Sequence, residues 1–358
     1  MDFGIGFPSY IRAWEDAKRA EDYGFTHAWF YDSQMIYSDV YATMALAAEH
    51  TRHIKLGTLV AVPGNRIAPV TAHSIATINE LAPGRVILGV GTGFTGRNVM
   101  GMPPIPLKTL REHIHVIRAL VQGKEALYRE GDRERWVRLL HPGMGYVNLE
   151  DPIPIHMASN APNALKMVGE VSDAWITISL DTGEIRHSIK KIKQSAEAAG
   201  RKLDPLYTTT LTSGCVLRPG ESITSRRVLD RVGPFAIVLL HTRWEPGELK
   251  IGPFAPPSIA QLARRYYEEH IMKMKAPLDR RFQDMHYGHV IFLQPGEDKF
   301  CTPELIKMAT LTGSAGEILE RIKALEEAGV TNVGIHLSGS DGRELIQEFG
   351  REIINKYN

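Results

Sequence analysis

The sequence has few of the features that mark secreted, membrane-spanning or nucleic-acid-binding proteins. It has only two cysteines, Cys215 and Cys301, far apart and in no CxxC or metal-type spacing, which argues against a disulfide framework. No segment approaches the roughly 18 apolar residues that span a bilayer, and the first residues lack the basic start and apolar run of a signal peptide. Lysine and arginine (42) nearly balance aspartate and glutamate (41), so the positive excess that nucleic acids and acidic lipids attract is missing. We therefore expect a cytoplasmic protein that binds neither nucleic acid nor membrane.

What the chain does have is a regular alternation of short apolar segments and amphipathic segments. Its 358 residues would suit two average domains or one barrel. The apolar segments predict eight strands, over 3–7, 28–31, 54–62, 85–90, 153–157, 174–178, 206–216 and 330–337. The segments between them predict helices, including 40–50, 69–81, 161–171, 181–200 and 343–357, and a capping-box pattern at Ser314 and Glu317 predicts a helix to residue 328. Strands separated by such helices pair in parallel, which favours a single (β/α)8 TIM-barrel domain over residues 1–358; an open doubly wound sheet is the alternative.

Two stretches interrupt this rhythm, at about 122–150 and 232–295. The first is polar, and the second is rich in proline, histidine and aromatic residues. Long insertions in a compact domain are usually functional. In a barrel, we expect them to build walls and a lid over the catalytic face, which lies at the carboxyl ends of the strands.

Reading the carboxyl ends of the predicted strands gives the candidate site. These ends are segments 32–34, 59–63, 91–93, 158–160 and 177–179, and they carry one carboxylate, small hydroxyls, amides and exposed backbone. Such a set is poor for hydrolysis and suits a planar, hydrogen-bonding ring and a phosphate. The glycine-rich segment 89–93 fails the dinucleotide fingerprint, and no helix-opening pattern accompanies it. We infer that a cofactor supplies the chemistry.

The histidines of the second insertion offer other candidates. His286 and His289 are three residues apart, with His270 nearby, a spacing that could place a metal pair on a helix. No cysteine and few carboxylates complete such a set, so no metal is expected. Because His241, His270, His286 and His289 lie in the predicted wall, they are candidate acid–base groups, and the catalytic residues otherwise stay unassigned.

The strand ends also match a known pattern. Segment 56–63, then Pro69-Val70 and a helix to Leu81, then segment 83–93, together resemble the bacterial-luciferase-like family of flavin- and deazaflavin-dependent oxidoreductases. Segments 110–123, 154–160 and 172–175 are similar to later parts of that family. The likeness covers about residues 3 to 200 and the last 45.

The resemblance implies a cofactor ring lying across the strand ends. Leu59-Val60 matches a bulge that often contains a non-proline cis peptide bond and supports the ring, and Asp32 matches a position that contacts the ring edge. Ala158, Ser159, Asn160, Thr177 and Ile178 match the phosphate region, where the start of the following helix would favour an anion. The remaining cofactor-binding candidates are Ser33, Thr92, Gly93 and Asn98.

The family divides into enzymes that use reduced FMN with oxygen and enzymes that use a deazaflavin for hydride transfer. Deazaflavin members commonly carry Asp-His after the second strand and a Glu and an Asn after the glycine segment, whereas this chain has Asp32-Ser33 and then Phe94 and Arg97-Asn98. These departures favour a monooxygenase that uses reduced FMN and oxygen on a small organic substrate. The alternatives are a coenzyme F-420-dependent hydride-transfer enzyme resembling methylenetetrahydromethanopterin reductase, and a non-catalytic ligand-binding barrel. The family often dimerises, so a homodimer is expected.

Overall fold

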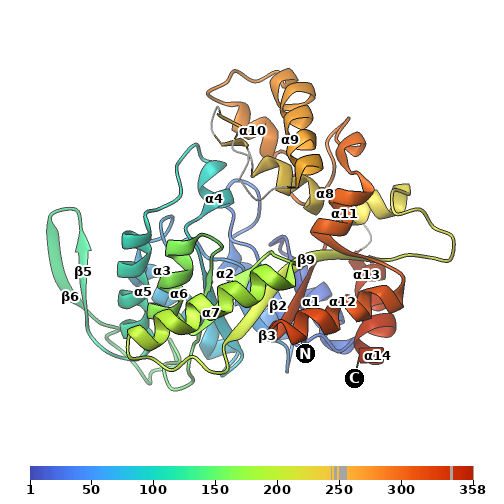
Figure 1. Cartoon of the computed structure of the whole chain (residues 1–358). Coiled ribbons are helices and arrows are strands. Elements are labelled where there is room, and N and C mark those ends of the chain that lie inside the picture. The colour runs from blue at the N-terminus through green and yellow to red at the C-terminus, as the bar shows by residue number, and fades with distance from the viewer. Residues whose placement is uncertain (243, 246–247, 250–255, 339–341, 358) are drawn as a thin grey trace. The chain divides into compact units, whose positions relative to one another are not determined.

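Eight parallel strands with helices between them form a (β/α)8 barrel in a computed structural model of the chain (Figure 1). The structure describes residues 1–242, 244–245, 248–249, 256–338 and 342–357. The barrel strands are β1 (Asp2–Phe7), β2 (His27–Phe30), β3 (Lys55–Thr58), β4 (Val86–Val90), β7 (Ile155–Ala158), β8 (Ala174–Thr177), β9 (Tyr207–Val216) and β13 (Asn332–His336). Their order is β9-β13-β1-β2-β3-β4-β7-β8, and a β8–β9 pairing closes the circle. The predicted fold class is confirmed.

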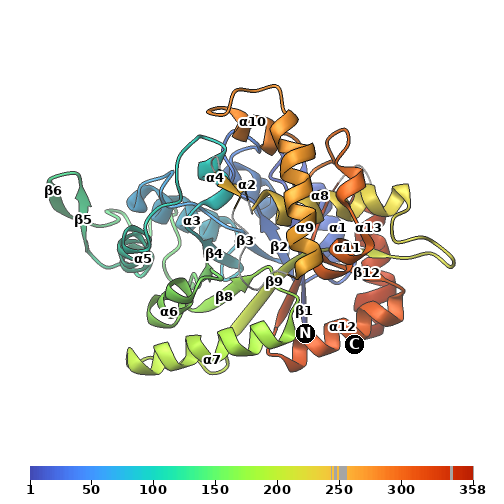
Figure 2. The ribbon, with the colours of Figure 1, turned by 45° about the horizontal axis from the view of Figure 1, so that its top comes forward.

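The chain packs as two units, and the first comprises residues 1–211 and 325–334. It contains the barrel strands up to β8, the beginnings of β9 and β13, and helices outside the strands (Figure 2). These helices are α1 (Ala13–Asp22), α2 (Val40–His50), α3 (Ala68–Leu81), α4 (Phe94–Asn98), α5 (Leu107–Val121), α6 (Pro162–Val171) and α7 (Thr182–Ala198). Asp39 starts α2 by accepting hydrogen bonds from the backbone N–H groups of Tyr41 and Ala42, both at 3.0 Å. The core that results is apolar, with Trp29 and Trp175 almost completely buried.

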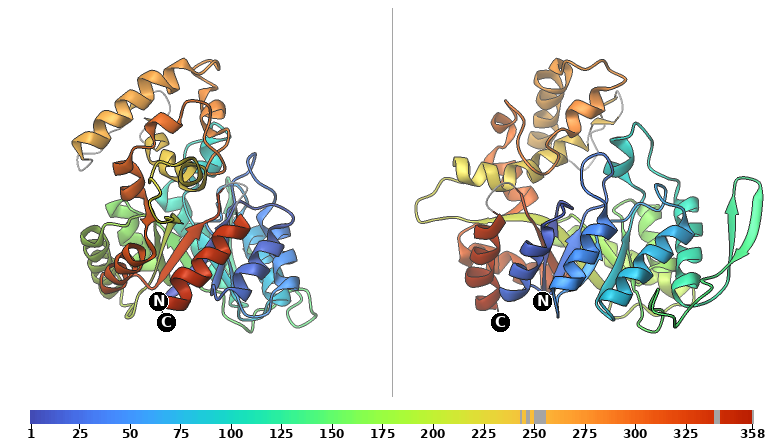
Figure 3. Two further views of the ribbon diagram at one scale, coloured as in Figure 1. Left: turned by 90° about the vertical axis from the view of Figure 1, so that its right-hand side faces the viewer. Right: turned by 180° about the vertical axis from the view of Figure 1, so that it is seen from behind.

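The first interruption of the pattern forms a two-stranded antiparallel ribbon in this unit. Strands β5 (Ala126–Glu130) and β6 (Arg133–Val137) pair with each other and with no barrel strand. The ribbon extends from the end of α5 away from the other helices of the unit (Figure 3). The exposed side chain of Trp136 lies on it.

The second unit comprises residues 212–324 and 335–358. Its strands are β10 (Trp244–Glu245), β11 (Glu248–Leu249) and β12 (Thr310–Gly313). Its α-helices are α8 (Arg226–His241), α9 (Pro257–Glu269), α10 (Arg281–His286), α11 (Pro303–Ala309), α12 (Ala315–Glu327), α13 (Gly342–Phe349) and α14 (Asn355–Tyr357), and the last residues of α12 belong to the first unit. Two 3-10 turns (Ile271–Lys273 and Asp298–Phe300) and a π-helical turn (Gly350–Ile354) complete it. The predicted capping box at α12 is confirmed, because Glu317 accepts from the Ser314 N–H at 2.7 Å and donates its own N–H to the Ser314 hydroxyl. Within the part of the chain that the structure describes, no helix is both long and apolar enough to cross a membrane.

The structure differs from the sequence analysis in four places. A short helix, α4, does begin immediately after Gly93, whose φ of 84° provides the turn from strand to helix. The predicted strand 54–62 ends at Thr58, and only Ala61 rejoins the sheet, through a bridge to Val90. Strand β12 was not predicted, and it pairs in parallel with the second half of β9. The insertion at 232–295 is mostly helical where it is described, and parts of it lie outside the described residues.

Candidate active site

The carboxyl ends of the strands in the first unit carry a buried ion pair that the sequence did not predict. The side chain of Asp32, which follows β2, is only 3% exposed and pairs with Arg66, whose Nη1 lies 3.0 Å from Oδ1 and 3.1 Å from Oδ2. Gln34 donates to Oδ1 at 2.6 Å, and the backbone N–H of Val62 donates to Oδ2 at 3.2 Å. Burial raises the pKa of the Asp32 carboxyl, and the charge of Arg66 opposes that rise.

The consequence is that Asp32 already has its oxygens occupied by protein donors. Arg66 continues the connection to Asp39, the residue that begins α2, and its guanidinium carbon lies 5.0 Å from the centre of the Tyr41 ring. Asp32 therefore ties the end of β2 to the segment after β3 and, through Arg66, to α2. Whether it also contacts a cofactor ring stays a prediction.

A second polar network joins the ends of β2, β3 and β4. Asn65 donates its amide N–H to Gln34 and to the carbonyl of Gly96, at 3.3 Å for the latter. Arg97, on α4, donates to the Asn65 side chain and the Gly64 carbonyl, each at 3.2 Å. These contacts fix the loops after three neighbouring strands relative to one another, so the surface between the loops is preorganised.

The predicted bulge after β3 is present. The Leu59-Val60 peptide bond is cis, which agrees with the resemblance. Beside it, Gly91 after β4 lets Val60 approach closely, because a Cβ atom there would lie 2.8 Å from Val60 Cγ2 and 3.8 Å from the Ala158 Cβ. Val60, Gly91 and Ala158 thus meet at one place at the ends of three neighbouring strands.

The predicted phosphate region comes together at the ends of β7 and β8. The Thr177 hydroxyl donates to Asn160 Oδ1 at 2.8 Å, and the Ser159 carbonyl accepts from the Trp175 indole at 2.8 Å. Ser159 Oγ is buried and has no hydrogen-bond partner among the described residues. Helix α6 begins at Pro162, three residues after Ser159, and the backbone N–H groups that follow Pro162 in its first turn have no partner within the helix. These donors match an anionic group, and the site residues fit a cofactor that carries one.

The remaining predicted residues lie around these two regions. Thr92 accepts the Ile105 N–H at 2.9 Å, Gly93 precedes α4, and Asn98 ends it. Ser33 follows Asp32 directly and accepts backbone N–H groups from Ile36 and Tyr37 through its carbonyl. Ile178 is 39% exposed, as a residue that contacts a ligand from outside the core can be.

The four candidate histidines gather in the second unit. The ring centres of His286 and His289 are 5.2 Å apart, and those of His241 lie 6.5 Å and 6.3 Å from them. His270 stacks on Tyr266 with a ring-centre distance of 5.1 Å. His286 and His289 do not share a helix, since α10 ends at His286.

A buried carboxylate organises part of this cluster. Glu297 accepts from the Tyr266 hydroxyl at 2.6 Å and from His241 Nε2 at 3.3 Å. Burial alone would raise the pKa of Glu297, but these hydrogen bonds hold it below its usual value. Burial lowers the pKa of His286 to about 3 and holds that of His289 well below its usual value. The described histidines, cysteines and carboxylates contain no group of three that could hold a metal ion.

Sequence reasoning named Asp32 but missed the residues that hold it. Arg66 follows a Pro-Gly-Asn turn after β3, and Asp32 follows the neighbouring strand β2. A single cation and a single carboxylate after neighbouring strands were a signal in the sequence that the two side chains pair. Only the tertiary structure places Asn65 and Arg97 in the same network.

Comparison with known proteins agrees with this geometry. A barrel whose strand ends offer an apolar surface and an anion site is typical of oxidoreductases that use a flavin or deazaflavin. The sequence profile of the luciferase-like monooxygenase family matches residues 7–332. The chain belongs to this family, and it is a flavin- or deazaflavin-dependent oxidoreductase.

Two relatives and one solved structure are among the most similar. The 5,10-methylenetetrahydromethanopterin reductase of Archaeoglobus fulgidus is 28% identical over 366 residues, covering 99% of each chain. The F-420-dependent glucose-6-phosphate dehydrogenase of Nakamurella multipartita is 27% identical over 296 residues, covering 78% of this chain and 80% of that protein. The coenzyme F-420-dependent tetrahydromethanopterin reductase of Methanopyrus kandleri superimposes with a TM-score of 0.75 at 21% identity, covering 100% of this chain and 99% of the other.

Proposed function

We propose that the protein is a coenzyme F-420-dependent oxidoreductase that transfers a hydride between the deazaflavin and a small organic substrate. The observation that carries this proposal is likeness to a reductase over 99% of the chain, together with likeness to an F-420-dependent dehydrogenase over 78% of it. This reverses the order of preference that the sequence alone suggested, in which reduced FMN and oxygen ranked first.

The residues at the strand ends fit such a cofactor. Val60, Gly91 and Ala158 would support the ring, because their apolar atoms meet at the ends of three neighbouring strands. The Ser159 hydroxyl and the first turn of α6 would hold the phosphate. When bound, the deazaflavin supplies two-electron hydride chemistry. The chain's own contribution is to bind it, orient it and keep the loops fixed.

Two side chains of this chain differ from those common in the deazaflavin branch, and the proposal takes them into account. Ser33 stands where members of that branch commonly have histidine, and Phe94 stands where they have glutamate. Neither side chain can take up a proton from the substrate at neutral pH. We infer that any acid–base group lies elsewhere, and the histidines of the second unit keep their place as candidates.

The first experiment is titration of the purified apo-protein with coenzyme F-420, FMN and reduced FMN, followed by fluorescence. We expect the deazaflavin to bind most tightly and to be reduced or oxidised by substrate without oxygen uptake. Preferential binding of reduced FMN with substrate-dependent oxygen uptake would overturn the proposal in favour of the monooxygenase, which the description of the matching family favours. Cofactor binding without turnover would point to a binding protein.

A pair of glycine variants tests the position of the ring. In Gly91→Ala the new methyl group pushes on Val60, so the dissociation constant of the cofactor should rise about tenfold or more. Gly316→Ala is the matched control, because nothing lies within 4 Å of a Cβ atom there. Equal affinities in the two variants would remove Val60 and Gly91 from the cofactor site.

A further inference from the structure

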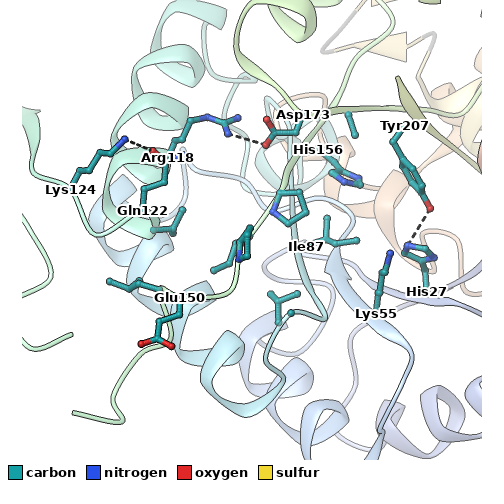
Figure 4. A pocket seen from close by; sticks show the side chains of 18 residues that line it. His27, Lys55, Ile87, Arg118, Gln122, Lys124, Glu150, His156, Asp173 and Tyr207 are labelled. Atoms are coloured by element: carbon teal, nitrogen blue, oxygen red, sulfur yellow. Dashed lines mark hydrogen bonds and ion pairs between the residues drawn. The ribbon is translucent and has the colours of Figure 1, made fainter. Parts of the chain in front are cut away.

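A cavity of about 890 Å³ opens at the amino ends of the barrel strands, the end opposite the candidate active site (Figure 4). The first residues of five strands line it: His27, Lys55, Val86, Ala174 and Tyr207. His156, the second residue of β7, lies among them, and the end of α5 and segment 149–154 form the outer wall. Catalytic sites of this fold lie at the other end of the strands, so the proposed oxidoreductase chemistry leaves the cavity without a role.

Most polar groups at this mouth of the barrel are already paired. Asn332 Nδ2 lies 2.9 Å from His27 Nδ1, and His27 Nε2 lies 3.2 Å from the Tyr207 hydroxyl oxygen. Tyr207 in turn donates to the Asp2 carboxylate at 2.6 Å. This chain of hydrogen bonds satisfies His27, Tyr207 and Asp2 within the protein.

His156 differs from these neighbours. Its side chain is 4% exposed, its ring centre lies 5.6 Å from that of Tyr207, and no described residue forms a hydrogen bond with either of its ring nitrogens. A neutral imidazole always carries one donor and one acceptor, and a buried polar group without a partner costs about 1–3 kcal/mol. An imidazole of this kind in the wall of a cavity is suited to a ligand that completes its hydrogen bonds.

An unpaired lysine lines the same cavity as this imidazole. Lys55 pairs with His27 in the parallel register of β2 and β3, so both side chains lie on the same side of the sheet. The Lys55 ammonium has no ion-pair or hydrogen-bond partner among the described residues. Burial is the main cause of the low pKa values of His27 and His156, and the Lys55 charge lowers both further. All three side chains line the cavity (Figure 4).

The other charges around the cavity are accounted for. Asp173 is paired with Arg118 at 3.0 Å and with Arg201 at 3.5 Å. Asp2 is engaged by Tyr207, and Lys124 donates to the Gln122 side chain at 3.1 Å. Glu150 adds a negative charge on the outer wall, as the close view shows (Figure 4). A single unpaired ammonium, with the carboxylates of Asp173, Asp2 and Glu150 around the cavity, favours an anion of single charge over a phosphate dianion.

We propose that this cavity binds a small organic monocarboxylate, held at its carboxylate by Lys55 and His156. Its volume is many times the roughly 30 Å³ of a water molecule and falls in the range of organic ligand sites. The buried side chains of Val86, Ile87 and Ile153 line the cavity and provide the apolar surface for the rest of the molecule.

The test uses benzoate as the probe and the full-length protein labelled with ¹⁵N in its histidine rings. Benzoate should shift the ring signals of His156, which are assigned by their absence in His156→Gln, and calorimetry should give a saturable isotherm. Benzamide, which has the same ring without the charge, should bind at least about tenfold more weakly than benzoate. Unchanged His156 signals, meaning that water alone fills the cavity, or equal binding of the two probes would overturn the proposal.

Lysine variants provide the second readout. Lys55 is exposed on the first residue of a strand, so Lys55→Met should fold, and it should lower the affinity for benzoate about tenfold. Lys108→Met, which removes an exposed lysine of α5 outside the cavity, should leave that affinity unchanged. Loss of binding in both variants, or in neither, would exclude Lys55 as the carboxylate-binding group. No cofactor is needed, so the outcome is independent of the proposed oxidoreductase activity.

Discussion

Replacing Arg66 with methionine tests how the candidate active site is held together. The variant keeps an unbranched side chain against the Tyr41 ring but removes the one cation among the described residues that pairs with Asp32. The Asp32 carboxylate would then be buried with two uncharged donors, Gln34 and the Val62 N–H. The change leaves a buried carboxylate without a counter-charge, which lowers the free energy of unfolding.

The size of the effect follows from the burial of the two partners. Breaking a fully buried ion pair costs about 3–5 kcal/mol of unfolding free energy. The side chain of Asp32 is 3% exposed, but that of Arg66 is 20% exposed, so solvent screens part of the interaction. We therefore expect the variant to lose about 3 kcal/mol at pH 7, the lower end of that range.

The loss should depend on pH with a defined sign. Burial already raises the pKa of Asp32 above its usual 3.8, and losing Arg66 removes the main opposing influence. A carboxyl with a raised pKa in the folded state destabilises the protein increasingly as pH rises from 3.8 through that raised pKa. The difference between wild type and variant should thus be largest at pH 7 and shrink as the pH approaches 4.

Urea unfolding followed by circular dichroism at pH 7 and pH 5 measures this difference. The double variant Asp32→Asn/Arg66→Met has no buried charge and should recover at least half of the lost stability. Arg12→Met breaks an exposed pair with Glu15 and should change stability by less than about 0.5 kcal/mol. A loss that is independent of pH, or a double variant as unstable as the sum of the single changes, would refute the reasoning.

Three further predictions concern other parts of the fold. His27 and His156 have pKa values of about 4 and about 3, below the usual 6.5, so the stability that their neutral forms provide is complete above pH 6.5 and is lost as the pH falls from there. In His156→Phe, the free energy of unfolding measured with urea should fall between pH 7 and pH 5 by about 2 kcal/mol less than it does in wild type. Gly89→Ala should cost about 3 kcal/mol in the same assay and lower the yield of folded protein, since its Cβ would lie 2.1 Å from the Thr58 carbonyl oxygen and the backbone must move. Glu297→Gln should lower the unfolding free energy by about 2 kcal/mol, because two buried donors lose a charged acceptor; an unchanged midpoint would show that the histidine cluster does not need that charge.

Local patterns in the sequence predicted most of the barrel strands, and most of the helices between them, within one or two residues. The predicted helix 40–50 and the observed α2 coincide, and the end of α3 at Leu81 was also predicted. These elements succeed because apolar periodicity and capping residues act within a few positions of each other. Strand β12 was missed because Thr-Leu-Thr-Gly is short, follows a helix without a turn signal and becomes a strand only by pairing with β9.

By itself, the sequence determined the barrel, the positions of the strand ends and, through family resemblance, the cis bond at Leu59-Val60. The tertiary structure alone decided which polar groups meet, since Asp32 and Arg66 are 34 positions apart and His27 and Asn332 are 305 apart. It also decided that His156 lines a cavity without a hydrogen-bond partner. Periodicity is a local property of the chain, whereas pairing, burial and the pKa values that follow depend on which distant segments the closed barrel brings together.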